Sequence, residues 1–144
     1  MTFNEIFKEL LLENELNAKQ LSKMIGIQDS TLYKYLNQTL PRVENIVKIA
    51  NYFNCSVNYL MGIDELPKQT TFTQTYNKKI FFHRYDNLLL SNNLTHYKLS
   101  KKIGIKNSSL LAWKNGTIPY LDVLEKIAKY FSCSIDYLIG RSDS

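Results

Sequence analysis

Lysine side chains dominate one short stretch of the chain. The segment from Thr95 to Gly116 has no acidic residue, carries a net charge of +5, and contains Lys98, Lys101, Lys102, Lys106 and Lys114. Ammonium groups in such a cluster neutralise phosphates, which attracts proteins to nucleic acids. The same pattern is also common on ordinary solvated surfaces, so the elements that hold the lysines must decide between the two interpretations.

The overall charge of +5 is unevenly shared along the chain. Residues 1–64 carry six basic and seven acidic side chains, net −1, whereas residues 80–144 carry nine and five, net +4. The intervening residues 65–79 carry three and one, net +2. Any electrostatic attraction to an anionic partner is therefore expected to come mainly from the C-terminal half.

The lysine-rich stretch has a counterpart 78 residues earlier. Pairing residue i with i+78 over residues 7–62 gives 26 identities in 56 positions without a gap. "LSKMIGIQDSTLYKYLNQTLP" begins at Leu21, and "LSKKIGIKNSSLLAWKNGTIP" begins at Leu99. An internal repeat of this length predicts two small domains, 1–64 and 80–144. The polar residues 65–79, which lack apolar periodicity, are predicted to be a linker.

Each copy predicts five short helices and therefore an all-α fold. Phe3, Phe7 and Leu10 lie at helical spacing, as do their counterparts in the second copy. Asn17, with Gln20 three residues on, is expected to cap the second helix, and Thr95 caps its counterpart.

Glycine and proline residues mark the remaining boundaries. Gly26 and Gly104 are expected to turn the chain into a third helix over 29–37 and 107–115. Pro41 and Pro119 precede a fourth helix, and "SVNYLMG" or "SIDYLIG" forms the fifth.

Two short helices that meet at a glycine corner suit the DNA major groove, which admits one helix. With "LSKxIGI", the "IAxYFxCSxxYLxG" tail and "WKNGTIP", both copies resemble the helix-turn-helix domains of the Cro and phage-repressor (XRE) family. The resemblance implies two tandem lambda-repressor-like domains that bind double-stranded DNA. Gln38 replaces the glycine of that last motif in the first copy, which predicts either a strained backbone or a different turn.

The resemblance also implies which side chains face DNA. Base reading is expected from Gln28, Asp29, Ser30, Lys34, Lys106, Asn107, Ser108 and Ala112. The resemblance places backbone contacts at Asn37, His96 and Asn115, and at Ala18, which lacks a donor. The positive charge of the same segments adds Lys19, Lys98, Lys101, Lys102 and Lys114 as expected backbone contacts. Asn107 can form two hydrogen bonds with adenine, and Lys34 or Lys106 can donate to guanine or to phosphate. Asp29 can accept from cytosine or can cap its helix.

No residue pattern predicts an enzyme, a cofactor or a metal site. His83 and His96 are isolated, and no glycine-rich phosphate loop or nucleophile–base set occurs. Cys55 and Cys133 occupy equivalent positions and are interpreted as buried thiols. There is no apolar run long enough for a membrane and no basic start of a signal peptide, so a cytoplasmic protein is expected.

Two functional hypotheses follow. The first is a transcriptional repressor of phage or mobile-element type, whose two units read two different half-sites. The second is an antitoxin-like or anti-CRISPR-type regulator in which the more acidic first unit binds a protein while the second binds DNA. The first hypothesis also allows a homodimer with four readers.

Overall fold

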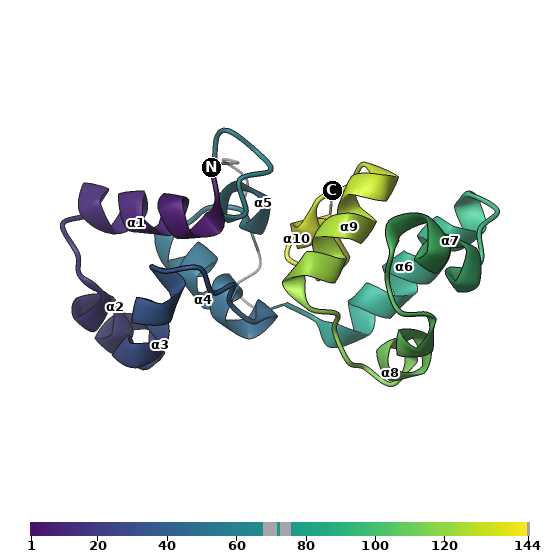
Figure 1. Cartoon of the computed structure of the whole chain (residues 1–144), viewed down its shortest axis with the longest axis horizontal. Coiled ribbons are helices and arrows are strands. Elements are labelled where there is room, and N and C mark those ends of the chain that lie inside the picture. The colour runs from purple at the N-terminus through teal and green to yellow at the C-terminus, as the bar shows by residue number, and fades with distance from the viewer. Residues whose placement is uncertain (68–71, 73–75, 144) are drawn as a thin grey trace. The chain divides into compact units, whose positions relative to one another are not determined.

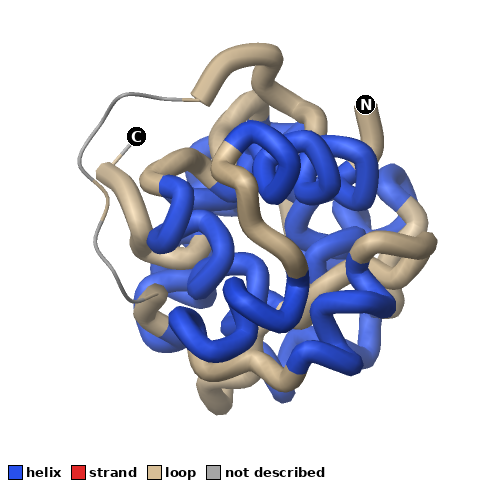
Figure 2. Tube along the Cα trace, turned by 90° about the vertical axis from the view of Figure 1, so that its left-hand side faces the viewer, coloured by secondary structure: helices blue, strands red, loops and turns tan. Residues whose placement is uncertain are grey.

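The computed structural model describes residues 1–67, 72 and 76–143, and it divides into two compact units, Met1–Gln74 and Thr75–Ser144. The chain is 63% helical, and the described residues contain no strand (Figure 2). The predicted all-α fold is confirmed. Residues 68–71 and 73–75 of the predicted linker 65–79 lie outside the described residues.

Five helices make up the described part of the first unit (Figure 1). They are α1 (Phe3–Glu13), α2 (Ala18–Ile25), α3 (Asp29–Tyr35), α4 (Val43–Phe53) and α5 (Val57–Leu60). The apolar stripe of α1 faces inward, because Phe3, Ile6 and Phe7 are buried. Helix α4 contributes Ile46, which is fully buried. The short α2–α3 pair is therefore held on a core that the longer helices supply.

The second unit repeats this plan with a longer first helix (Figure 1). Its elements are α6 (Lys78–Ser91), α7 (His96–Ile103), the 3₁₀ turn η1 (Asn107–Ser109), α8 (Leu110–Lys114), α9 (Leu121–Phe131) and α10 (Ile135–Leu138). Phe81 and Tyr85 from α6 are fully buried, as are Leu124 and Ile127 from α9. Helix α6 begins at Lys78, slightly before the predicted start of the second domain.

The predicted helix starts and the glycine corners are confirmed. Asn17 and Gln20 form a reciprocal capping box, and the hydroxyl of Thr95 accepts from the amide of Lys98. Gly26 and Gly104 both end their helices in the left-handed conformation, at φ 71° and φ 72°. This backbone suits glycine, because a Cβ atom there crowds the following carbonyl.

The third helix is shorter than predicted in both copies. Helix α3 ends at Tyr35 and α8 ends at Lys114, rather than at Asn37 and Asn115. In the second unit the first turn is the 3₁₀ turn η1, whereas α3 is α-helical from Asp29. The two copies thus present the same segment on differently wound backbones.

The turn after the third helix also differs between the copies. Gly116 has φ 96°, which favours glycine, whereas Gln38 is not among the residues with positive φ. Of the two interpretations of Gln38, the structure has the different turn and not the strained backbone.

Candidate nucleic-acid interface

The start of the third helix presents polar side chains to solvent in the second unit. Lys106, Asn107 and Ser108 are exposed around η1, and Ala112 is exposed one turn later on α8. The opposite side of the same segment is anchored, because Trp113 is only 4% exposed. An anchored helix with a polar outer face has the geometry needed to read base edges in a groove.

The equivalent face of the first unit is exposed as well. Gln28, Asp29, Ser30 and Lys34 all reach solvent at α3, whose inner side buries Leu32. The carboxylate of Asp29 accepts a hydrogen bond of 2.8 Å from the amide of Ser30. Asp29 is the first residue of α3, and the N-cap position is occupied by Gln28, which makes no side-chain capping hydrogen bond.

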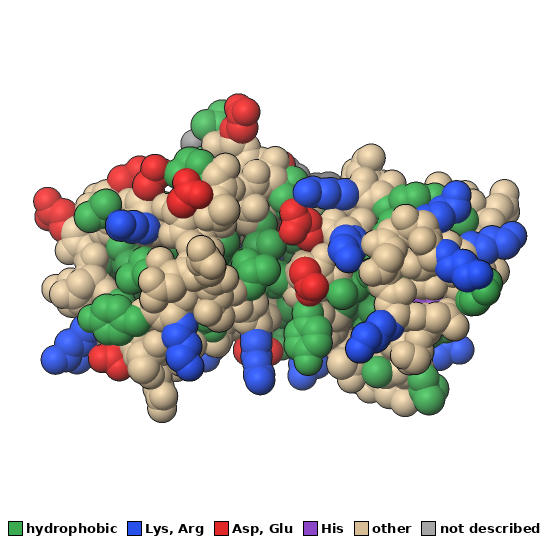
Figure 3. Space-filling model, viewed as in Figure 1, with side chains coloured by type: hydrophobic (Ala, Val, Ile, Leu, Met, Phe, Trp, Pro, Cys, Tyr) green, Lys and Arg blue, Asp and Glu red, His purple; other side chains and the backbone are tan. Residues whose placement is uncertain are grey.

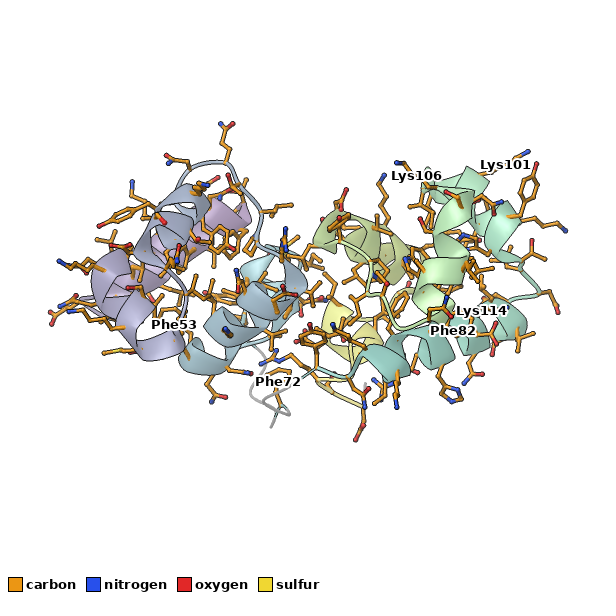
Figure 4. The ribbon with its side chains drawn as sticks, turned by 90° about the horizontal axis from the view of Figure 1, so that it is seen from below. Phe53, Phe72, Phe82, Lys101, Lys106 and Lys114 are labelled. Atoms are coloured by element: carbon orange, nitrogen blue, oxygen red, sulfur yellow. The ribbon has the colours of Figure 1, made fainter. Side chains whose placement is uncertain are left out.

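The five lysines between Thr95 and Gly116 are all exposed. Lys98, Lys101 and Lys102 lie on α7, Lys106 precedes η1, and Lys114 ends α8. Within the described part of the chain none of them pairs with a carboxylate. Figure 4 shows Lys101 and Lys106 at the outer edge of the unit, and the Lys101 ammonium lies 4.4 Å from the centre of the Tyr97 ring. These charges are free to meet phosphates.

The first unit carries less positive charge on the same elements. The segment from Asn17 to Gln38 holds three lysines and one aspartate, net +2, against +5 for its counterpart. Lys19 and Asn37, two of the predicted backbone contacts, are exposed, and the side-chain amide of Asn37 donates to the carbonyl of Tyr33 at 3.2 Å. Figure 3 shows acidic side chains gathered over α1 and basic ones over α7.

His96 is placed differently from the other predicted backbone contacts. Its side chain is only 5% exposed, and both ring nitrogens have partners inside the unit. Nδ1 lies 2.7 Å from the hydroxyl of Tyr85, and Nε2 lies 3.1 Å from the carbonyl oxygen of Asn107. The structure therefore does not bring the His96 imidazole to the surface, and we leave His96 out of the proposed DNA contacts.

The His96 contacts define one tautomer. A carbonyl can only accept, so Nε2 carries the proton and donates to Asn107, while Nδ1 accepts from Tyr85. Burial lowers the pKa of His96, with hydrogen bonds to the Asn107 and Lys106 carbonyls opposing it, and burial raises the pKa of Tyr85. The neutral imidazole thus links the core to the backbone of a predicted base-reading residue.

This link is specific to the second unit. At the equivalent positions the first unit has Phe7, Ala18 and Tyr35 in place of Tyr85, His96 and Trp113. Trp113 packs edge-on to the rings of Tyr85 and His96, at centroid distances of 5.3 and 5.2 Å. Sequence reasoning missed this cluster, although the joint change of three core positions between the copies was a visible signal.

Comparison with known proteins identifies the class of both units. Residues 7–60 match the helix-turn-helix family, and residues 85–144 match the Cro/C1-type helix-turn-helix DNA-binding domain. The chain therefore consists of two tandem Cro/C1-type helix-turn-helix domains, which identifies it as a DNA-binding transcription regulator. Neither a curated protein nor a solved structure matches the chain significantly.

Metal-binding clusters and membrane spans are both absent from the described residues. Residues 1–67, 72 and 76–143 hold no group of three or more His, Cys, Asp or Glu side chains that could bind a metal. Cys55 is buried and Cys133 is half-buried, and burial raises the pKa of the Cys133 thiol to about 11. No helix in the described ranges is both long and apolar enough to cross a bilayer.

Proposed function

We propose that this protein is a sequence-specific repressor of phage or mobile-element type, acting in the cytoplasm, whose two units read two unlike half-sites on double-stranded DNA. The observation that carries the proposal is that α7, η1 and α8 together expose Asn107, Ser108 and five lysines, none of which pairs with a carboxylate of the described residues. Lysines supply affinity by neutralising phosphates, while Asn107 and Ser108 supply discrimination between bases.

The differences between the two copies support unlike half-sites. Helix starts and corners are shared, whereas the outward positions change from Gln28, Asp29 and Lys34 to Lys106, Asn107 and Ala112. A glutamine and an asparagine both suit adenine, but a lysine prefers guanine and an alanine can only make apolar contact. Two readers on one frame would therefore select different sequences.

A second candidate function rests on exposed apolar side chains of the first unit. Met24 on α2 is 59% exposed, and Lys102 stands at its equivalent position in the second unit. Tyr33 on α3 is 50% exposed, but its counterpart Leu111 is apolar and 69% exposed, so the difference between the units lies at Met24. Apolar side chains on the face that would meet phosphates favour a protein partner for this unit. In that case the second unit alone would bind DNA for autoregulation.

Charge-removing variants of the full chain separate the two functions. One variant replaces Lys101, Lys102 and Lys106 by alanine, and its counterpart replaces Lys19, Lys23 and Lys34. If both units read DNA, each triple substitution weakens binding to the preferred duplex and flattens its salt dependence. If the first unit binds a protein, only the first variant has this effect.

A further inference from the structure

The second unit has a groove beside the predicted interface that the sequence did not assign. Its volume is about 450 Å³. It runs between the first turns of α6 and the end of α8, and its lining includes Lys78, Lys79, Phe82, Asp86, Lys114 and Asn115. Figure 4 shows Phe82 and Lys114 close together, one from each helix. Lys114 and Asn115 are already predicted DNA contacts, so the groove continues that surface onto α6.

The groove is basic and its charges are uncompensated. Three lysines oppose one carboxylate, so the lining has a net charge of +2 with His83 neutral. Lys78, Lys79 and Lys114 form no ion pair with any described residue, Asp86 included. The Nε2 atom of His83 lies 3.3 Å from the side-chain nitrogen of Asn87. An anion that enters would meet ammonium groups on both walls.

Both walls of the groove are fixed by the fold. The amide of Asn77 donates to the carbonyl of Ile139 at 2.9 Å, and the Asn77 side chain caps the amide of Lys79. On the other wall, Trp113 packs edge-on against Phe81 with ring centres 5.6 Å apart. The lysines therefore project from anchored backbone, which lowers the entropic cost of holding an anion between them.

The first unit has the same groove with different chemistry. It is lined by Thr2, Asn4, Glu5, Lys8, Leu36, Asn37 and Gln38. One lysine opposes one glutamate there, so its net charge is zero. Asn4, which occupies the position of Phe82, donates to the carbonyls of Tyr35 and Thr39 at 2.6 and 3.1 Å and joins the two walls. Duplication has thus kept the groove and made only one copy basic.

We infer that the basic groove of the second unit binds a phosphodiester of the DNA backbone through Lys78, Lys79 and Lys114, next to the bases that η1 reads. The inference rests on the proposed DNA-binding function. Phe82 adds an apolar side chain to the lining of the same groove, which suits a deoxyribose attached to the phosphate better than a free inorganic anion. This contact would extend the footprint of the second unit by a phosphate that the first unit does not hold.

The test uses the full chain and the duplex that it prefers. Lys78→Ala/Lys79→Ala should weaken binding about three- to tenfold at moderate salt and flatten the slope of log K against log salt by about one to two. The loss should be the same for preferred and unrelated duplexes. Lys129→Ala is the matched control, because Lys129 lies on α9 and pairs with Glu125.

A second variant separates the sugar contact from the charges. Phe82→Asn introduces the residue that the first unit uses at this position, so the fold should be retained. It should weaken duplex binding and leave the salt slope unchanged, because the lysines remain. A thermal melt checks that the variant is folded.

The outcomes divide cleanly. If the wild-type chain binds no duplex, the proposed function itself fails. If the wild type binds but the double lysine variant keeps its slope, this inference alone is overturned. A second result would also overturn it. Millimolar sodium phosphate, at constant ionic strength, would shift the Asn115 amide resonance, while duplex binding would be the same with and without Lys78 and Lys79. The groove would then bind a small anion and not the DNA backbone.

Discussion

Asn107 and Lys102 lie five positions apart in the second unit and are expected to act on different parts of the duplex. Asn107 opens η1, where its side chain is exposed, while Lys102 is exposed near the end of α7. An amide that forms two hydrogen bonds with one base discriminates between sequences, whereas an ammonium beside phosphate does not. Single substitutions can therefore separate the recognition of bases from the electrostatic attraction to phosphates.

Asn107→Ala should reduce discrimination at one base pair. The loss should be about 1 to 3 kcal/mol on the preferred duplex and close to zero on duplexes already altered at that pair. A panel of single-base variants of the preferred site, measured at one salt concentration, gives this profile. A uniform loss across the panel would contradict the base-reading role.

Lys102→Ala should weaken binding to all duplexes alike. Removing one ammonium from the phosphate-facing surface should reduce the slope of log K against log salt by about one. Titrations at several salt concentrations, with preferred and unrelated duplexes, measure the slope. Lys129→Ala should leave the slope unchanged, and a loss confined to the preferred duplex would assign Lys102 to base reading instead.

His96 should make the second unit sensitive to acid. Its pKa is lowered from 6.5 in the folded state, mainly by burial, so the unfolded chain takes up the proton first as the pH falls. The contribution of His96 to stability is therefore fully present above the unfolded pKa and is lost progressively as the pH falls from there through the lower, folded pKa. Thermal melts of the full chain should show a lower midpoint for the second unit near pH 5 than near pH 7.5.

His96→Gln is the control for this acid effect. The glutamine amide can still donate to the Asn107 carbonyl, but it does not titrate in this range. The part of the pH dependence that comes from His96 should disappear in this variant. An unchanged decline in acid would show that other groups cause it.

At the scale of elements, the glycine corners fix the entry of the third helix. A Cβ atom on Gly104 would meet only the Lys126 ammonium, 4.0 Å away, so the cost of Gly104→Ala comes from its φ of 72° and not from a clash. The expected loss is about 1 to 2 kcal/mol in the unfolding of the second unit. Denaturant unfolding measures it.

Two further substitutions test whether backbone conformation causes this loss of stability. Gly26→Ala should have a similar effect on the first unit, because its φ is 71° and the space that a methyl group would fill is open, with nothing within 4 Å. Ser132→Gly should act in the opposite direction and stabilise the end of α9, since Ser132 has φ 55°. A destabilising Ser132→Gly would refute the conformational argument.

Local signals predicted the elements better than their interactions. The capping box at Asn17 and the corners at Gly26 and Gly104 follow from short-range chemistry, so sequence reasoning placed them correctly. At the 3₁₀ turn, the carbonyl of Asn107 is bonded to His96, which in turn contacts Tyr85 from another helix. Neither His96 nor Tyr85 can be identified from the local sequence as a partner of this turn, so the turn at Asn107 was predicted to be α-helical.

The candidate site was predicted unevenly for a related reason. Exposed lysines such as Lys102 can be predicted from the sequence of α7 alone, because its apolar residues fall on one face and the lysines fall on the other. Lys78 and Lys79 were predicted to belong to the linker. The start of their helix is held by a hydrogen bond from the Asn77 amide to the carbonyl of Ile139, which lies at the far end of the unit and gives no signal in the local sequence. His96 was expected at the surface, and only the packing of Tyr85 and Trp113 shows that it is interior.

At the scale of the whole molecule, the two units have the same frame and different charge. The second unit's helix pair carries +5 and the first unit's carries +2. Because phosphate neutralisation supplies most non-specific affinity, the second unit should dominate attraction to any duplex, while the first adds selectivity at a neighbouring half-site. The predicted linker, 65–79, has 15 residues, of which Lys78 and Lys79 belong to α6. A flexible segment of about this length can bridge one turn of DNA, about 34 Å, but not several.

Selection from a random pool of duplex DNA by the full chain, at moderate salt, tests the central claim most directly. We expect an enriched sequence with two unlike half-sites whose centres lie about one helical turn apart. If no duplex is retained even in dilute buffer, the lysines of the second unit are a solvated surface and the DNA-reading account is wrong.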